Sequence, residues 1–232
     1  MELIARRFAE IIAGNIVFSE NYGESIKKWR ALFEVSQKEL AERLGITPSV
    51  ISDYEAGRRK SPGMSFIKKL VESLLDIDRE RGWKTVSRYK DLLGVEFDVI
   101  QDITEYSGPV PSKRLAEIID GELITDFGRM AMGHTVVDSL RAILSLSSYD
   151  FYKLYGLTSE RALIFTGVTT GRSPMVAVRV ANLKPSVVVL NPINGENVDR
   201  LAVRIAEIEG IDLIASDVER DELVERLKQL EV

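Results

Sequence analysis

The sequence predicts a two-domain α+β protein, in which an all-α N-terminal domain is followed by an α/β C-terminal domain with a parallel sheet. Up to about position 82, apolar residues recur at the three- and four-residue spacing of amphipathic helices. After position 160, three short apolar runs alternate with three helical segments, an order that parallel sheets with crossover helices produce. We therefore expect a helical domain at 1–82, a linker at 83–111 and an α/β domain at 112–232.

Five helical segments are predicted in the N-terminal domain. Apolar spacing and capping signals place these helices at 2–13, 24–33, 36–45, 47–57 and 61–81. A short extended piece is predicted between the first two, at 14–20. Ser36 with Glu39 three residues later matches a capping box, and Pro48 stands at a first helical position, where no amide donor is needed. Gly45 and Gly57 follow the third and fourth segments, as glycines that end helices do.

The C-terminal domain begins with less regular patterns. A strand is predicted at 94–100, a helix at 113–120, and further helical material at 135–147 and 150–156. The apolar runs at 161–168, 186–192 and 211–217 then predict strands buried on both faces. The helices that follow them are expected at 174–183, 196–209 and 219–230.

Composition restricts the class of protein. The 232 residues are 45% hydrophobic and 29% charged, which is typical of a soluble globular protein. The apolar runs are far shorter than the ~20 residues that span a bilayer, and the N-terminus lacks the pattern of a secretory signal. The chain contains no cysteine, so disulfides and thiolate metal sites are excluded. We expect a cytoplasmic protein without a membrane partner.

Charge is distributed unevenly along the chain. The net charge is −5, which argues against a protein that coats nucleic acid nonspecifically. Residues 20–95, however, carry 15 Lys and Arg against 12 Asp and Glu. The N-terminal third is therefore the positive part, which leaves room for a small basic module that binds nucleic acid.

The segment 29–62, WRALFEVSQKELAERLGITPSVISDYEAGRRKSP, has two short helices joined by a tight turn, the spacing of a helix-turn-helix. It resembles the DNA-binding domain of the lambda repressor/Cro (Xre) type. The matching positions are Ser36-Gln37, Leu40-Ala41, Gly45, Ile51, Glu55-Ala56-Gly57 and Arg58-Arg59. The whole chain is similar to archaeal regulators that pair this domain with a second, C-terminal one. The resemblance implies an all-α helix-turn-helix domain, with a core at about 20–80, that binds an operator in double-stranded DNA.

The helix at 47–57 would be the recognition helix. Val50, Ile51 and Tyr54 form its apolar set and are expected in the core, while the resemblance implies a structural role for Glu55. The solvent side and the basic residues after the helix would contact base edges and phosphates. The candidate DNA-binding residues are Gln37, Thr47, Pro48, Ser49, Ser52, Asp53, Arg58, Arg59 and Lys60.

Asp53 departs from the family pattern, in which Arg, Lys or Gln often occupies this position. Its carboxylate can accept a hydrogen bond from cytosine N4, or repel a phosphate and sharpen selectivity. The alternative is an ion pair with Arg58 or Arg59. Two aromatic residues of the segment, Trp29 and Phe33, are interpreted as core residues rather than as side chains on which nucleic-acid bases stack.

In the C-terminal domain, ligands of a parallel sheet are expected at the carboxyl ends of its strands. The candidate site there is a hydroxyl-rich loop before a helix, where free amides and an arginine favour a small anionic or phosphorylated effector. Its residues are Thr166, Gly167, Thr169, Thr170, Gly171, Arg172 and Ser173. The alternative is a tight strand–helix connection with Pro174 at the helix start. The strand–loop–helix order over 161–230 also weakly resembles the DRTGG-type domain, which favours a regulatory α/β module.

Other polar residues carry weaker signals. Asn191, Asn194 and Asp217 follow the next two strands, where they suit a ligand site or, equally, turns and helix caps. His134 is the only histidine, and a lone histidine is more often structural than functional. No catalytic set, metal site or cofactor motif is recognised.

These observations favour a DNA-binding transcription regulator that acts as a homodimer, because one recognition helix covers few base pairs. Its C-terminal domain would bind a ligand, dimerise, or both. Two alternatives stay open, namely an enzyme with a DNA-binding appendage and an adaptor whose helical domain binds protein.

Overall fold

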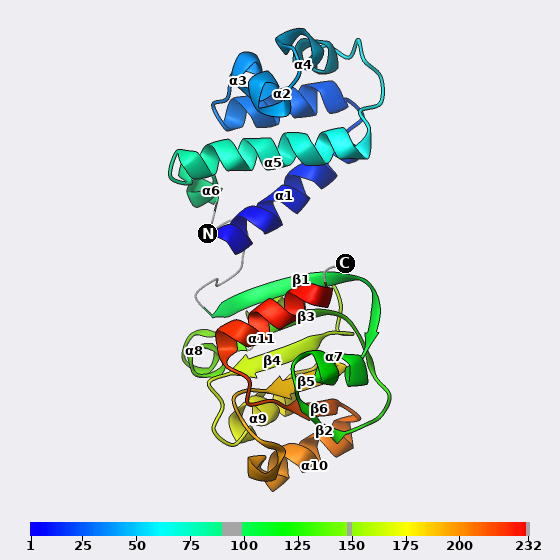
Figure 1. The fold of residues 1–232 in the computed structure, drawn as a ribbon, viewed down its shortest axis with the longest axis vertical. Helices are drawn as coiled ribbons and strands as arrows, with labels where there is room; N and C mark the ends of the chain where they lie inside the picture. The colour runs from blue at the N-terminus through cyan, green and yellow to red at the C-terminus, as the bar shows by residue number, and fades with distance from the viewer. Residues whose placement is uncertain (90–98, 148–149, 231–232) are drawn as a thin grey trace. The chain divides into compact units, whose positions relative to one another are not determined.

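The computed structural model describes residues 1–89, 99–147 and 150–230, and the chain divides into two compact units between positions 94 and 95 (Figure 1). The first unit is all-α, and the second combines a mixed sheet with helices. The overall class is therefore α+β, which confirms the predicted fold class.

The N-terminal unit is built around one apolar core. Its helices are α1 (Glu2–Val17), α2 (Tyr22–Leu32), α3 (Gln37–Leu44), α4 (Pro48–Glu55), α5 (Met64–Glu80) and α6 (Lys84–Tyr89). Fully buried side chains come from several of these helices, including Ile12, Ile26, Leu40, Ile51 and Leu74. Trp29 and Phe33 are also buried, and both rings contact Phe8, with ring centroids 5.7 Å and 6.0 Å away. They are core residues, as the sequence predicts.

Three boundaries in this unit differ from the prediction. Helix α1 continues to Val17, so most of the predicted extended piece is helical; Gly14 is accommodated inside the helix with open space beside it. Helix α5 begins at Met64 rather than at Ser61, because Ser61 has a φ of 67°, which a right-handed helix does not contain. Helix α6 lies within the range predicted as linker.

The described part of the C-terminal unit contains one six-stranded sheet in the order β1-β3-β4-β5-β6-β2. The strands are β1 (Ile100–Pro111), β2 (Glu122–Thr125), β3 (Met130–Asp138), β4 (Ala162–Thr166), β5 (Val187–Leu190) and β6 (Asp212–Ala215). Neighbours from β3 to β6 are parallel, whereas β1 and β2 pair antiparallel at the two edges. Every residue of β4, β5 and β6 is buried, as expected for strands covered on both faces.

Helices cover both faces of this sheet (Figure 1). They are α7 (Ser112–Ile118), α8 (Ser139–Ser145), α9 (Arg172–Val180), α10 (Arg200–Glu209) and α11 (Arg220–Leu227), with 3-10 turns η2 (Asp150–Tyr155), η3 (Gly195–Asn197) and η4 (Lys228–Leu230). Leu115 of α7 and Leu223 of α11 share a core with Ile164 of β4. The next residue, Phe165, points to the other face, because side chains alternate along a strand.

The edge strands are where sequence and structure differ. β1 occupies residues predicted as linker, and β3 includes residues 135–138, which were predicted as helical. Thr135 pairs with Ile103 of β1 and with Leu163 of β4, so the position of β3 depends on partners distant in sequence. The strand predicted at 94–100 lies outside the described residues at positions 94–98.

Candidate nucleic-acid interface

The turn between α3 and α4 has the geometry of a helix-turn-helix. Gly45 has φ 66° and ψ 32°, a left-handed conformation that costs least for glycine. At the other end of α3, the Ser36 hydroxyl accepts a hydrogen bond from the Glu39 amide at 3.1 Å. The Glu39 carboxylate contacts Arg81 at 2.6 Å, which fastens the start of α3 to the end of α5.

Helix α4 begins at the predicted position, with Thr47 as its N-cap residue and Pro48 in the first helical position. The Thr47 side chain makes no capping hydrogen bond; its hydroxyl lies 2.8 Å from that of Ser49. These two exposed hydroxyls therefore stand together at the N-terminus of the helix, the end that enters a major groove in this motif.

The inner side of α4 is packed tightly onto α2 and α5. Ile51 is fully buried, Tyr54 stacks on Phe66 with ring centroids 4.3 Å apart, and Val50 is half-buried. Of the three predicted core residues, only Ile51 is thus fully inside. A Cβ on Gly23 of α2 would lie 2.5 Å from the Tyr54 carbonyl oxygen, so glycine there lets the two helices approach.

Glu55, at the end of α4, holds the unit together through a buried ion pair. Its carboxylate accepts hydrogen bonds from Arg30 Nε at 2.5 Å and Nη2 at 2.8 Å, and from Gln37 Nε2 at 2.8 Å. Burial by itself would raise the pKa of Glu55, but the hydrogen bonds and the charge of Arg30 hold this pKa below its ordinary value. The Gln37 amide is consequently engaged inside the unit, beside the start of α3.

The outer side of α4 carries Ser49, Ser52 and Asp53. Asp53 Oδ1 lies 2.7 Å from Arg58 Nε, and Asp53 Oδ2 lies 4.0 Å from Arg59 Nε. Arg58 Nη2 also donates to the Ser52 hydroxyl at 3.3 Å. Asp53 therefore takes part in the ion pair that was predicted as the alternative to a base contact.

The basic residues that follow α4 are held in place by Tyr22. Its hydroxyl donates to the Arg59 carbonyl at 3.0 Å and accepts from the Ser61 amide at 3.1 Å. Arg58, Arg59 and Lys60 are exposed, and the Arg59 guanidinium lies 5.7 Å from the Tyr54 ring centroid. Sequence reasoning missed Tyr22, which precedes the segment 29–62, and Arg30, which lies in that segment but before the two helices joined by the turn.

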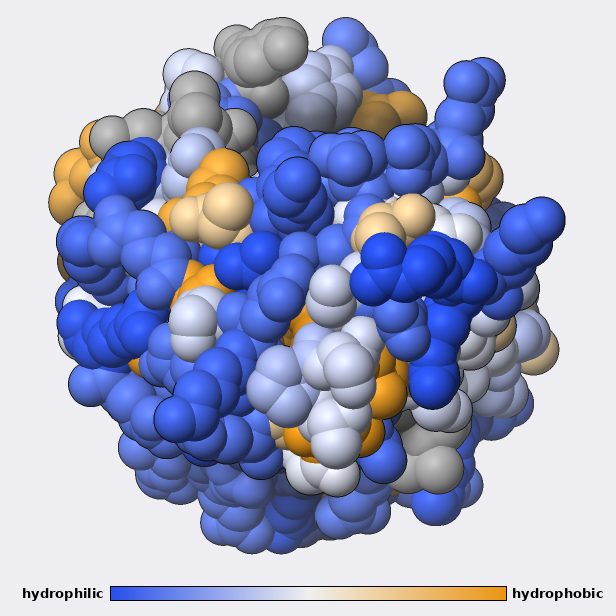
Figure 2. Space-filling model, turned by 90° about the horizontal axis from the view of Figure 1, so that it is seen from above, coloured by the Kyte–Doolittle hydropathy of each residue, from blue (hydrophilic) through white to orange (hydrophobic). Residues whose placement is uncertain are grey.

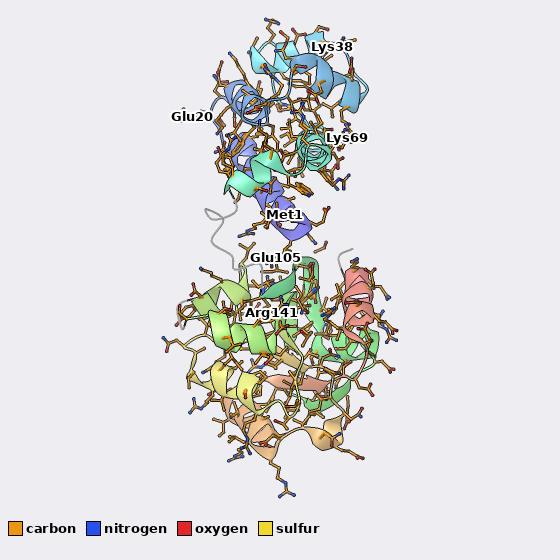
Figure 3. The ribbon with its side chains drawn as sticks, turned by 90° about the vertical axis from the view of Figure 1, so that its left-hand side faces the viewer. Met1, Glu20, Lys38, Lys69, Glu105 and Arg141 are labelled. Atoms are coloured by element: carbon orange, nitrogen blue, oxygen red, sulfur yellow. The ribbon has the colours of Figure 1, made fainter. Side chains whose placement is uncertain are left out.

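The surface of this unit is hydrophilic around the motif. Figure 2 views the molecule from the side of α3 and α4 and shows mainly hydrophilic residues with small, separate apolar patches. Lys38 of α3 is exposed and lies at the outer edge of the unit (Figure 3). A polar surface with a fixed basic segment is suited to phosphate contacts.

The candidate effector loop in the C-terminal unit is only partly assembled as a site. Thr169 and Thr170 line an open hollow of about 490 Å³ at the carboxyl ends of β4 to β6, together with Pro192, Asn194 and Asp217. Thr166 is buried, and its hydroxyl lies 3.2 Å from the Val137 carbonyl.

The remaining loop residues serve the connection between β4 and α9. Arg172 Nη2 pairs with Asp199 at 2.8 Å, which lowers the pKa of that carboxyl. Gly167 and Gly171 have φ values of 69° and 78°, and a side chain at 171 would overlap Leu190. Ser173 is exposed in the first turn of α9.

Asn191 and His134 are both buried. Asn191 Nδ2 donates to the carbonyls of Ser216 and Val218, and its Oδ1 has no partner among the described residues. His134 lies 2.9 Å from the Tyr106 hydroxyl through Nδ1 and 2.6 Å from Asp102 through Nε2. Burial raises the pKa of Tyr106 above its ordinary value. His134 therefore links β1 to β3.

Comparison with known proteins agrees with the geometry of the N-terminal unit. Residues 26–74, which include the turn and both of its helices, match the helix-turn-helix family model HTH_3. A protein of Archaeoglobus fulgidus named an uncharacterized HTH-type transcriptional regulator is 54% identical over 224 residues, which are 97% of each chain. The chain belongs to this family of HTH-type transcriptional regulators.

A second HTH-type transcriptional regulator, from Methanocaldococcus jannaschii, is 49% identical over 228 residues, 97% of this chain and 95% of its own. No solved structure matches the chain. Within the described residues of this HTH-type regulator, no group of three His, Cys, Asp or Glu side chains is placed to hold a metal ion. Its described helices are also too short or too polar to cross a membrane.

Proposed function

We propose that the protein binds an operator in double-stranded DNA as a homodimer, with α4 in the major groove. The observation that carries the proposal is the Tyr22 hydroxyl bridge, which fixes the backbone that carries the exposed cations 58–60 directly after α4. Because the backbone is already ordered, only side-chain freedom is lost when these cations meet phosphates. Such contacts set the register of the helix, and Ser49, Ser52 and Asp53 would then face base edges.

The test is a mobility-shift titration on the region upstream of the protein's own gene. Arg58→Ala/Arg59→Ala should weaken binding and lower the slope of log K against log salt by up to about 3.6 for the dimer, since each phosphate contact contributes ~0.9 and each of the two copies loses two cations. Arg204→Ala/Arg226→Ala is the control, because it removes the same charge from exposed ion pairs of the C-terminal unit. If both variants lost DNA affinity equally, the effect would be due to net charge, which would contradict a role of the basic segment 58–60.

A dimer is expected because a single recognition helix contacts few base pairs. Two copies would place their recognition helices in successive major grooves, about one helical turn of DNA apart. The footprint should therefore be a pseudo-palindrome. Protection of one half-site alone at saturating protein would contradict the proposal.

We further propose that the loop 166–173 takes a small anionic or phosphorylated effector. The hollow beside Thr169 and Thr170 and the α9 N-terminus support this idea, while Asp217 and the Arg172–Asp199 pair oppose it. Calorimetry with inorganic phosphate, phosphorylated sugars and nucleotides tests it, with Arg172→Ala as the variant and Arg204→Ala as the control. Absence of heat, or equal binding by Arg172→Ala, would reject the site.

A further inference from the structure

Helices α8 and α9 expose an apolar surface that the C-terminal unit leaves uncovered. Five aliphatic side chains form it, and we call it the α8–α9 patch: Leu140, Ile143, Leu144, Val176 and Val180. Leu144 and Val180 are 77% and 76% exposed. Ile143 and Val180 border the same groove, so the two helices contribute to one continuous surface.

The groove within the patch is small and apolar. Phe151, Phe165, Pro174 and Ala177 form its floor and walls, and its volume is about 270 Å³. Pockets for small-molecule ligands typically have ~300–1,000 Å³. The size is better suited to a few protein side chains than to a ligand of that kind.

We propose that the α8–α9 patch is the interface through which a second copy of this chain forms the dimer. This proposal rests on the function proposed above, since it names the surface that joins the two DNA-binding units. Leu140 and Leu144, four residues apart on α8, are exposed beside the groove. These two side chains of each copy can therefore enter the groove of the other about a two-fold axis. Such reciprocal contact is what a two-fold interface requires.

The patch accounts for a large part of the apolar area of a dimer interface. Burying an aliphatic side chain completely contributes ~2.5 kcal/mol, which at ~25 cal/mol per Å² corresponds to ~100 Å² of apolar surface. Scaled by the exposed fractions of the five patch residues, the apolar area of the patch is on the order of 300 Å². A standard interface buries ~800 Å² per partner, of which ~500 Å² is apolar. The patch thus supplies more than half of the apolar area before the groove walls are counted.

The charges around the patch also favour a second copy over a charged partner. Arg141 pairs with Asp138, and Arg179 pairs with Glu209 at 2.5 Å (Figure 3 labels Arg141 on α8). A two-fold axis brings identical side chains together, and like charges there would repel. The five patch residues are uncharged and the neighbouring arginines are already paired, so self-association meets no such repulsion.

The test is the mass of the full chain in solution without DNA, measured by sedimentation at micromolar concentration. The wild type should sediment as a dimer of the 26.0 kDa chain. Ile143→Glu places two like charges at the interface and should raise the dimer dissociation constant about 1,000-fold. Ile208→Glu is the matched control, because Ile208 of α10 is 57% exposed against 55% for Ile143, and it should remain dimeric. Circular dichroism confirms that both variants fold.

A second measurement uses the absence of cysteine from the chain. Leu144→Cys should be joined into a covalent dimer by a short bis-maleimide cross-linker, and Ile208→Cys should not. A monomeric wild type, a dimeric Ile143→Glu or equal cross-linking of the two cysteine variants would overturn the proposed surface. DNA binding is measured separately, so loss of the interface and failure of the DNA-binding function remain distinguishable.

Discussion

Asp53 and Arg58 form an ion pair on the outer side of the recognition helix, with Oδ1 and Nε 2.7 Å apart. The pair lies at the surface that we propose meets DNA. One of the cations available for phosphate is therefore partly neutralised by a carboxylate of the recognition helix. This arrangement suits a protein that reads sequence more than one that binds any duplex.

Asp53→Asn should release Arg58 and raise affinity for unrelated DNA. The slope of log K against log salt should become steeper by up to ~1.8, the value of one phosphate contact from each copy of the dimer. Asp76→Asn is the control, because Asp76 holds Arg79 at 2.8 Å on α5 without belonging to the motif. If Asp53 also reads a base, selection from random duplexes will return a different operator for Asp53→Asn. Identical slopes and operators would make Asp53 a surface residue.

Glu55→Ala should destabilise the N-terminal unit by about 3 kcal/mol, since it leaves the partly buried Arg30 without its carboxylate partner. Both tryptophans, Trp29 and Trp83, lie in this unit, so tryptophan fluorescence in urea reports on it selectively. Glu80→Ala is the control, because it removes the partner of Arg43 from an exposed pair and should leave the midpoint nearly unchanged.

The same ion pair should make the unit sensitive to acid. The pKa of Glu55 is lower in the folded state than in the unfolded chain. Its contribution to stability is thus complete above the unfolded value of ~4.3 and is lost as pH falls through the lower, folded value. Urea midpoints followed by tryptophan fluorescence between pH 6 and pH 3 should fall less steeply for Glu55→Gln. Parallel profiles would show that other carboxylates cause the acid sensitivity.

Gly23→Ala should destabilise the unit by about 1–3 kcal/mol and weaken DNA binding, because a Cβ there meets the α4 backbone. Gly14→Ala is the matched change inside α1, where nothing lies within 4 Å of the added carbon. It should stabilise the helix by about 0.5–1 kcal/mol. Urea titration by fluorescence measures both, and equal effects would contradict the close approach of α2 to α4.

Arg161→Met should destabilise the C-terminal unit by about 3 kcal/mol. The buried guanidinium donates to the carbonyls of Tyr155 and His134 and pairs with Glu105, whose carboxylate would lose its partner. Circular dichroism should show an earlier transition that tryptophan fluorescence does not follow. Arg172→Met, at the exposed pair with Asp199, should leave that transition in place. If Arg161→Met shifted the circular dichroism and the fluorescence transitions equally, the result would contradict an effect confined to the C-terminal unit.

The sequence by itself determined the features that depend on neighbours along the chain. The Ser36 cap, the Gly45 turn, Pro48 at the start of α4 and the apolar strands β4 to β6 all follow from local spacing and conformational preference. These signals were sufficient to predict helix α4 and the family of HTH-type transcriptional regulators. The candidate residues on the outer side of α4 came from the same local pattern.

Only the tertiary structure decided the features that depend on distant partners. The Tyr22 bridge joins residues 37 and 39 positions apart, and the Arg30–Glu55 pair joins positions 25 apart. The edge strands β1 and β2 also form by pairing with strands far along the chain, so their residues carry little local signal. The α8–α9 patch could not be predicted from the sequence either. An apolar helix residue has the same local pattern whether its face is covered or exposed, and only packing distinguishes the two.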